Sequence, residues 1–310
     1  MLIMNFCRLF SFFCIILFCN SAFAETDSAC TRTAGGAIIA NALSPGSDGA
    51  AIVTDIGGET GSSCKEVPDF YKINFYKFGL CTANPYATGS GSTQDFSSCS
   101  FLLNNDASVE HIITGLAGSP LATNGDLATG TYNHLVMVLK NRLSQQLTET
   151  FNTTITGKTG AGTTCWTIAS TSAYGGGSIS GETLISPQPG SDNRATLGID
   201  CGSTADPDYT TEIYETLGDG SFDADMEEDA GLRVALLQAD GVTKATTISN
   251  AKQIMIVMDA AYTVTESSKY SLGFKMTASS SFDLNYQHSE TKIYALKVGA
   301  DPFQITFTIN

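Results

Sequence analysis

The chain has 310 residues and a formal net charge of −15 at pH 7, from 31 acidic and 16 basic residues. Such a charge repels phosphate backbones and anionic lipid surfaces, so nucleic-acid binding is not expected. The 30 glycines, with many Ser, Thr and Asn residues and no long charged helical pattern, predict an all-β protein.

The first 24 residues predict a signal peptide. Arg8 is their only charge, an apolar core SFFCIILF follows, and Ala22-Phe23-Ala24 matches an A-x-A cleavage signal. We expect cleavage before Glu25 and export to the cell surface or the extracellular space, with the periplasm as the alternative. No later apolar run is long enough to cross a membrane as a helix.

Six cysteines remain after the predicted cleavage, an even number that favours three disulfides in an exported chain. They are Cys30, Cys64, Cys81, Cys99, Cys165 and Cys201. Pairing in sequence order, 30 with 64, 81 with 99 and 165 with 201, would close three local loops.

The stretch FYKINFYKFGLC, from Phe70 to Cys81, alternates apolar and polar residues and predicts a strand. Its phase slips by one residue at Phe75-Tyr76. Either a β-bulge lies there or both faces of the strand are covered. A short run that begins at Cys99 predicts the neighbouring strand.

Residues Asp126 to Leu143 contain an L-x-x-G-x-Y pattern formed by Leu127, Gly130 and Tyr132, followed by an apolar strand. This pattern resembles bacterial extracellular immunoglobulin-like β-sandwich domains of the adhesin or pilus-subunit type. The resemblance implies that the tyrosine lies at a strand corner and that its hydroxyl binds back to the chain. Leucines at a spacing of four leave a short helix open over residues 141–152.

The run GDGSFDADMEED lies in a segment without basic residues and suggests a calcium site. The candidate ligands are Asp219, Asp223, Asp225, Glu227 and Asp229. The spacing does not fit an EF-hand, and a solvated acidic loop is the alternative interpretation. Calcium is thus the one cofactor that the sequence suggests.

The last eighty residues have the clearest strand patterns. Leu232 to Leu237 and Ile254 to Met258 predict buried strands, and Leu272 to Tyr286 predicts one long strand or a hairpin with an odd-numbered loop. The C-terminus alternates again, with Phe303, Ile305, Phe307 and Ile309 on one face. This strand would close its own sheet, or pair with the sheet edge of another subunit.

We therefore expect two β-sandwich halves, immunoglobulin-like or jelly-roll-like, with disulfide-braced loops, over residues 25–158 and 159–310. The expected role is that of a cell-surface structural or adhesive protein, such as a filament or surface-layer subunit, whose partners are other copies or a surface glycan or protein. A carbohydrate-binding module and an extracellular carboxylate-based polysaccharide hydrolase are the alternatives. No catalytic residues are predicted, since His111, His134 and His288 have no ligand-like or triad-like neighbours.

Overall fold

The computed structural model describes residues 29–43, 52–56, 59–60, 64–114, 119–156, 160–173, 199–214, 217, 222–228, 231–276, 282–287, 295–300 and 304–310. Within these ranges the chain forms twenty-one strands and one short 3-10 helix, η1 (Ile248–Asn250). The all-β prediction is confirmed. In this part of the chain no helix has the length and apolar character needed to cross a membrane.

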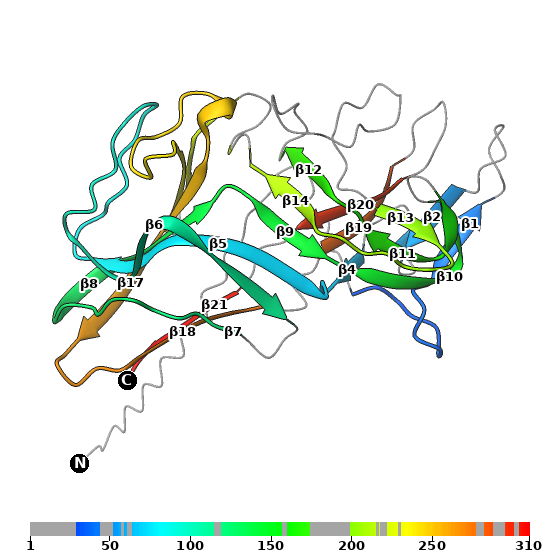
Figure 1. Cartoon of the computed structure of the whole chain (residues 1–310), viewed down its shortest axis with the longest axis horizontal. Coiled ribbons are helices and arrows are strands. Elements are labelled where there is room, and N and C mark those ends of the chain that lie inside the picture. The colour runs from blue at the N-terminus through cyan, green and yellow to red at the C-terminus, as the bar shows by residue number, and fades with distance from the viewer. Residues whose placement is uncertain are drawn as a thin grey trace, which may run out of the picture.

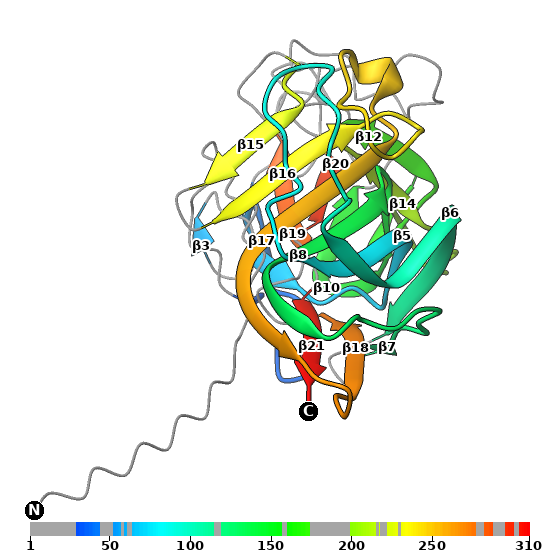
Figure 2. The same ribbon diagram turned by 90° about the vertical axis from the view of Figure 1, so that its left-hand side faces the viewer.

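The largest sheet has nine strands and is long and strongly curved (Figures 1 and 2). Its order is β12-β14-β9-β5-β8-β17-β16-β15, and β6 pairs with β5 in addition. The strands are β5 (Phe70–Cys81), β6 (Cys99–Thr114), β8 (Gly130–Lys140), β9 (Leu143–Gln146), β12 (Ser170–Ala173), β14 (Thr210–Ile213), β15 (Asp225–Glu228), β16 (Leu232–Leu237) and β17 (Gln253–Val264).

Four three-stranded sheets complete the described structure. One contains β1 (Ala40–Leu43), β2 (Ile52–Ile56) and β3 (Glu59–Thr60), and a second contains β10 (Thr148–Thr156), β11 (Ala161–Thr167) and β13 (Ile199–Gly202). A third contains β7 (Ser119–Pro120), β18 (Tyr270–Lys275) and β21 (Gln304–Ile309), and the fourth β4 (Cys64–Glu66), β19 (Phe282–Gln287) and β20 (Ala295–Ala300).

The predicted division at residues 158/159 does not separate these sheets. In the nine-stranded sheet β8 pairs with β17 over most of its length, although the two strands lie on opposite sides of that position. Likewise β10 pairs with β11 across it. The number of domains stays a prediction.

Both faces of the central strands are buried, which explains their nearly continuous apolar sequences. On one face Met137 and Leu139 of β8 join a large core that also includes Phe274 of β18 and Ile305 of β21. The opposite face holds a smaller core with Val136 and Val138 of β8, Val257 of β17 and Cys81. The curved sheet therefore has a main core and a second, smaller one on its other side.

The phase slip in β5 is a β-bulge. Its pairings with both β6 and β8 shift register between Phe75 and Lys77. The extra residue absorbs the slip, so Phe75 before it and Phe78 after it face the same large core.

Two local predictions are wrong. Residues 141–152 contain β9 and the first part of β10 rather than a helix, since alternate residues such as Leu143 and Leu147 are buried in extended chain. Likewise β18 and β19 are neither one strand nor a hairpin, because they pair in different sheets. An apolar period fixes which side chains share a face, but it does not specify the strand that pairs alongside.

Candidate functional site

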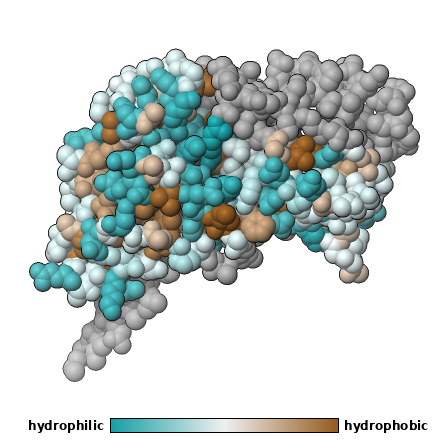
Figure 3. All heavy atoms as spheres, in the orientation of Figure 1, coloured by the Kyte–Doolittle hydropathy of each residue, from teal (hydrophilic) through white to brown (hydrophobic). Residues whose placement is uncertain are grey.

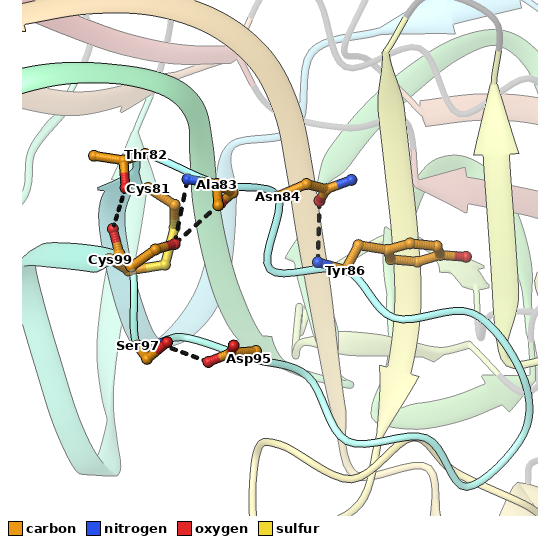
Figure 4. The surroundings of a disulfide bond; sticks show 9 residues. Cys81, Thr82, Ala83, Asn84, Tyr86, Asp95, Ser97 and Cys99 are labelled. Atoms are coloured by element: carbon orange, nitrogen blue, oxygen red, sulfur yellow. Dashed lines mark hydrogen bonds between the residues drawn. A yellow bond between two sulfur atoms is a disulfide. The ribbon is translucent and has the colours of Figure 1, made fainter.

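A loop over residues 82–98 joins β5 to β6, and a disulfide closes its base. Cys81 and Cys99 stand opposite each other in the strand pairing, with their Cα atoms 3.9 Å apart. Beside the bridge the Thr82 amide donates to the Ser98 carbonyl at 3.1 Å. Figure 4 shows Tyr86 pointing away from the disulfide, toward the strands drawn in yellow.

The far part of this loop is fixed to residues 240–246, which follow β16. The Gln94 amide donates to the Val242 carbonyl at 2.8 Å, and the Lys244 amide donates to the Ser92 carbonyl at 2.8 Å. Tyr86 and Phe96, which belong to this loop, pack on the smaller core. The loop therefore covers that core, and the disulfide and the hydrogen bonds to residues 240–246 hold it in place.

The side chains of a lysine and a tyrosine both contact one aspartate beneath the 82–98 loop. The Lys244 side chain is fully buried and its ammonium contacts a carboxylate oxygen of Asp225 on β15. The Tyr86 hydroxyl donates to the same oxygen, Oδ1, at 2.8 Å. Burial first, and then the hydrogen bond to Asp225, raise the pKa of the Tyr86 hydroxyl well above its ordinary value.

The predicted calcium ligands lie only partly in the described structure. Asp219 and Asp229 fall outside it, and the others lie in or next to β15. Asp225 contacts Lys244, and Glu227 Oε1 accepts from Arg233 Nε at 2.9 Å. In the described part of the chain no three His, Cys, Asp or Glu residues are grouped as metal ligands. Calcium binding stays a prediction.

A second charged network crosses the surface of β8, β16 and β17. Arg233 donates to Asp259 Oδ1 at 2.9 Å, and His134 Nδ1 lies 2.9 Å from the same oxygen. Partial burial lowers the pKa of Arg233, but hydrogen bonds to Asp259 and Glu227 outweigh it and raise that pKa. The network links neighbouring strands. Its two carboxylates, Asp259 and Glu227, are about half exposed, whereas the side chains of His134 and Arg233 are mostly covered.

The predicted partner strand at the C-terminus is the closing strand of its own sheet. Ile305 is buried, and the ring of Phe307 lies 5.2 Å from Phe78 and 5.3 Å from Tyr262 between centroids. Ile309 packs on the same core. Phe303 lies outside the described residues. Among the described strands β21 pairs only with β18, so the strand is a sheet edge.

Exposed large apolar side chains gather on β5 and β6. Phe70, Val109 and Ile112 expose 39%, 42% and 41% of their surface. Figure 3 shows the corresponding brown and tan area on the face that carries these two strands. Phe70 and Ile112 share one face, because Ile112 pairs with Lys72, two residues along β5.

Aromatic side chains, on which a bound sugar would stack, are divided between core and surface. Tyr71, Tyr214 and Trp166 are buried in the core. Tyr209 remains partly exposed, with Lys72 Nζ 4.0 Å from its ring centre. Tyr174 lies outside the described residues. No row of exposed rings forms in the described part of the chain.

The six cysteines agree with the predicted pairing as far as they are described. Cys81–Cys99 and Cys165–Cys201 are disulfides. Cys30 is also disulfide-bonded. The side chain of Cys64, its predicted partner, is outside the described side chains.

The cluster formed by Tyr86, Asp225 and Lys244 was not predicted from the sequence. Asp225 lies 139 residues from Tyr86 and 19 residues from Lys244, and Lys244 stands in a polar turn without any local motif.

No family model, curated protein or solved structure matches the chain.

Proposed function

We propose that the protein is an exported structural or adhesive component of the cell surface, which assembles through its sheet edges. The observation that carries this proposal is the exposed apolar group Phe70, Val109 and Ile112 on β5 and β6. Phe70 and Ile112 lie on one face of these strands, and Val109, which pairs with Phe75, lies on the other. Exposed large apolar side chains gathered along a sheet edge are typical of contact surfaces.

Strand β6 is suited to pair with a further strand. It has 16 residues and, among the described strands, pairs with β5 only. Residues near Leu102 are covered by the backbone amides of Asn124 and Gly125, and the Ile112 carbonyl accepts from the Ser119 hydroxyl at 3.2 Å. Val109 and the exposed side chain of Ile112 lie along the part of the strand beyond Leu102. An extended chain added beside these two residues would gain main-chain hydrogen bonds and apolar contacts.

A second copy of the protein offers a matching strand in β21, which is also a sheet edge. Pairing of β21 from one copy with β6 from the next would be head-to-tail and would continue along a filament. The sequence supports this setting through its predicted signal peptide, and the disulfides suit an oxidising compartment.

The test is assembly of the mature protein, residues 25–310, followed by negative-stain electron microscopy and light scattering after size exclusion. We expect ordered assemblies that are lost in the double variant Val109→Lys, Ile112→Lys and kept in Thr129→Lys, a change in an exposed loop. A wild-type protein that stays monomeric would overturn the proposal. Deleting the C-terminus is unsuitable, since Ile305 belongs to the core.

Carbohydrate binding is the second candidate, because one face combines rings with hydrogen-bonding groups. Phe70 and Tyr209 lie near Lys72, whose Nζ is 3.6 Å from Glu110 Oε2. Binding on a glycan array that is lost in Tyr209→Ala and Phe70→Ala would favour this function.

A further inference from the structure

The most unusual charged group in the described structure is the side chain of Lys244. It is fully buried, whereas lysine is almost never buried without a partner. Its Nζ contacts Asp225 Oδ1, donates to the Ala87 carbonyl at 2.6 Å and lies 4.5 Å from the ring centre of Tyr86. The amine is therefore held against one carboxyl group under an aromatic ring.

Burial changes the chemistry that this pair can perform. Condensation of an ammonium with a carboxylate begins with the passage of one proton from Nζ to the carboxyl group. The contact between Lys244 and Asp225 provides a direct path for that proton. A desolvated lysine amine is a nucleophile, and the electrophile is the carboxyl carbon of Asp225, which carries the oxygen that Nζ contacts.

Tyr86 is placed to assist an attack on that carbon. Its hydroxyl donates to Asp225 Oδ1 at 2.8 Å, the oxygen on which negative charge develops when the amine adds. A fixed donor at this position stabilises the tetrahedral intermediate, as donors do in an oxyanion hole.

We propose that Lys244 and Asp225 form an intramolecular amide bond. The Nζ lone pair attacks Cγ and the Nζ–Cγ bond forms. The Cγ–Oδ2 bond then breaks, and the Oδ2 hydroxyl leaves with one proton from the nitrogen as water. The reaction is a condensation, so it needs no oxidant, reductant or further reactant.

The surroundings also suit the product. The amide keeps one N–H, and the Ala87 carbonyl that now accepts from Nζ is in place to accept from it. Its carbonyl oxygen keeps the hydrogen bond from Tyr86. Both polar groups of a buried amide would thus be satisfied, which a buried site requires.

The bond would fasten an edge of the large sheet. Strand β15 is last in the strand order and pairs only with β16 among the described strands. A covalent link from Asp225 to Lys244 would tie this strand to the turn that the 82–98 loop covers. This inference does not depend on the proposed assembly.

Mass spectrometry of the purified, reduced and denatured protein tests the proposal. We expect an intact mass lower than that of the sequence by one water molecule. Trypsin does not cleave after an acylated lysine, so the peptide VALLQADGVTK, residues 234–244, should be missing. A branched peptide that joins residues 195–233 to residues 234–252 should replace it.

Three variants identify the groups involved. Lys244→Arg should restore the full mass, and Tyr86→Phe should increase the fraction without the bond. Lys72→Arg is the matched control, because Lys72 pairs with Glu110 at the surface, and it should keep the water loss. A wild-type protein of full mass that yields free VALLQADGVTK would overturn the proposal, even if Lys244→Arg failed to fold.

Discussion

The Tyr132 hydroxyl donates a hydrogen bond of 2.6 Å to the carbonyl oxygen of Ala128, four residues earlier in the chain. The tyrosine ring is buried at the start of β8, and the bond ties the preceding loop to that strand. This is the back-bonded tyrosine that the L-x-x-G-x-Y pattern implies. The geometry supports a structural role for the motif.

The variant Tyr132→Phe should therefore lower the free energy of unfolding by about 1 kcal/mol, the net value of one hydrogen bond. Tyr132→Ala should cost about 3–5 kcal/mol, because it also removes the ring from the core. Urea unfolding curves measure both. Equal losses in the two variants would show that the hydroxyl, and not the packing, carries the effect, contrary to this expectation.

Much of the fold could be predicted from local patterns. The slip at Phe75-Tyr76 became a bulge, and the buried strands β16 and β17 follow from their continuous apolar runs. Each described disulfide joins cysteines close in the sequence, at separations of 18 and 36 residues. These features depend on the spacing of apolar side chains along one strand and on short connections between cysteines, and both can be read from a single sequence.

The arrangement of strands and the candidate site could not be predicted in the same way. Pairing of β8 with β17, or of Asp225 with Lys244, depends on the path of the whole chain. The alternation of β18 and β19 is the same whether they pair with each other or, as found, in different sheets. Sequence patterns specify faces, and the neighbours are set by tertiary packing.

The two described disulfides should differ in their contribution to stability. Replacing Cys81 and Cys99 by Ser should cost about 3 kcal/mol through the restored freedom of the unfolded chain. The Cys165–Cys201 loop has twice the sequence separation, 36 against 18, so its loss should cost about 0.6 kcal/mol more. Guanidinium unfolding of the two double variants measures the difference. The reverse order would mean that native-state contacts decide the outcome.

Gly79 in β5 should not tolerate a side chain. A Cβ there would lie 2.3 Å from the Ser100 carbonyl oxygen of β6, and backbone cannot move aside as a flexible side chain can. Gly79→Ala should lower the free energy of unfolding by about 1–3 kcal/mol through overpacking. Gly35→Ala is the control, since its Cβ would meet only Thr33 Oγ1 at 3.8 Å. Thermal unfolding of both variants gives the comparison, and equal melting temperatures would contradict the prediction.

His111 should make the protein less stable in mild acid. Burial lowers its pKa below the usual 6.5, despite a hydrogen bond with the Ser119 backbone that raises it. Its ring lies among Phe75 and Phe274, with centroids at 6.1 and 5.7 Å. The unfolded chain therefore takes up the proton on His111 at a higher pH than the native protein does. The contribution of His111 to the free energy of unfolding is complete above pH 6.5, and it is lost as the pH falls through the window below that value.

The variant His111→Leu removes this titration and keeps an apolar side chain between the two rings. The difference in unfolding free energy between wild type and variant should be constant above pH about 6.5 and should decrease as the pH falls toward about 5. Carboxylates that also titrate in this range cancel in the difference, since both proteins contain them. Urea unfolding of the two proteins across this range provides the measurement. A difference that does not change with pH would show that His111 has the same proton affinity in the folded and the unfolded chain.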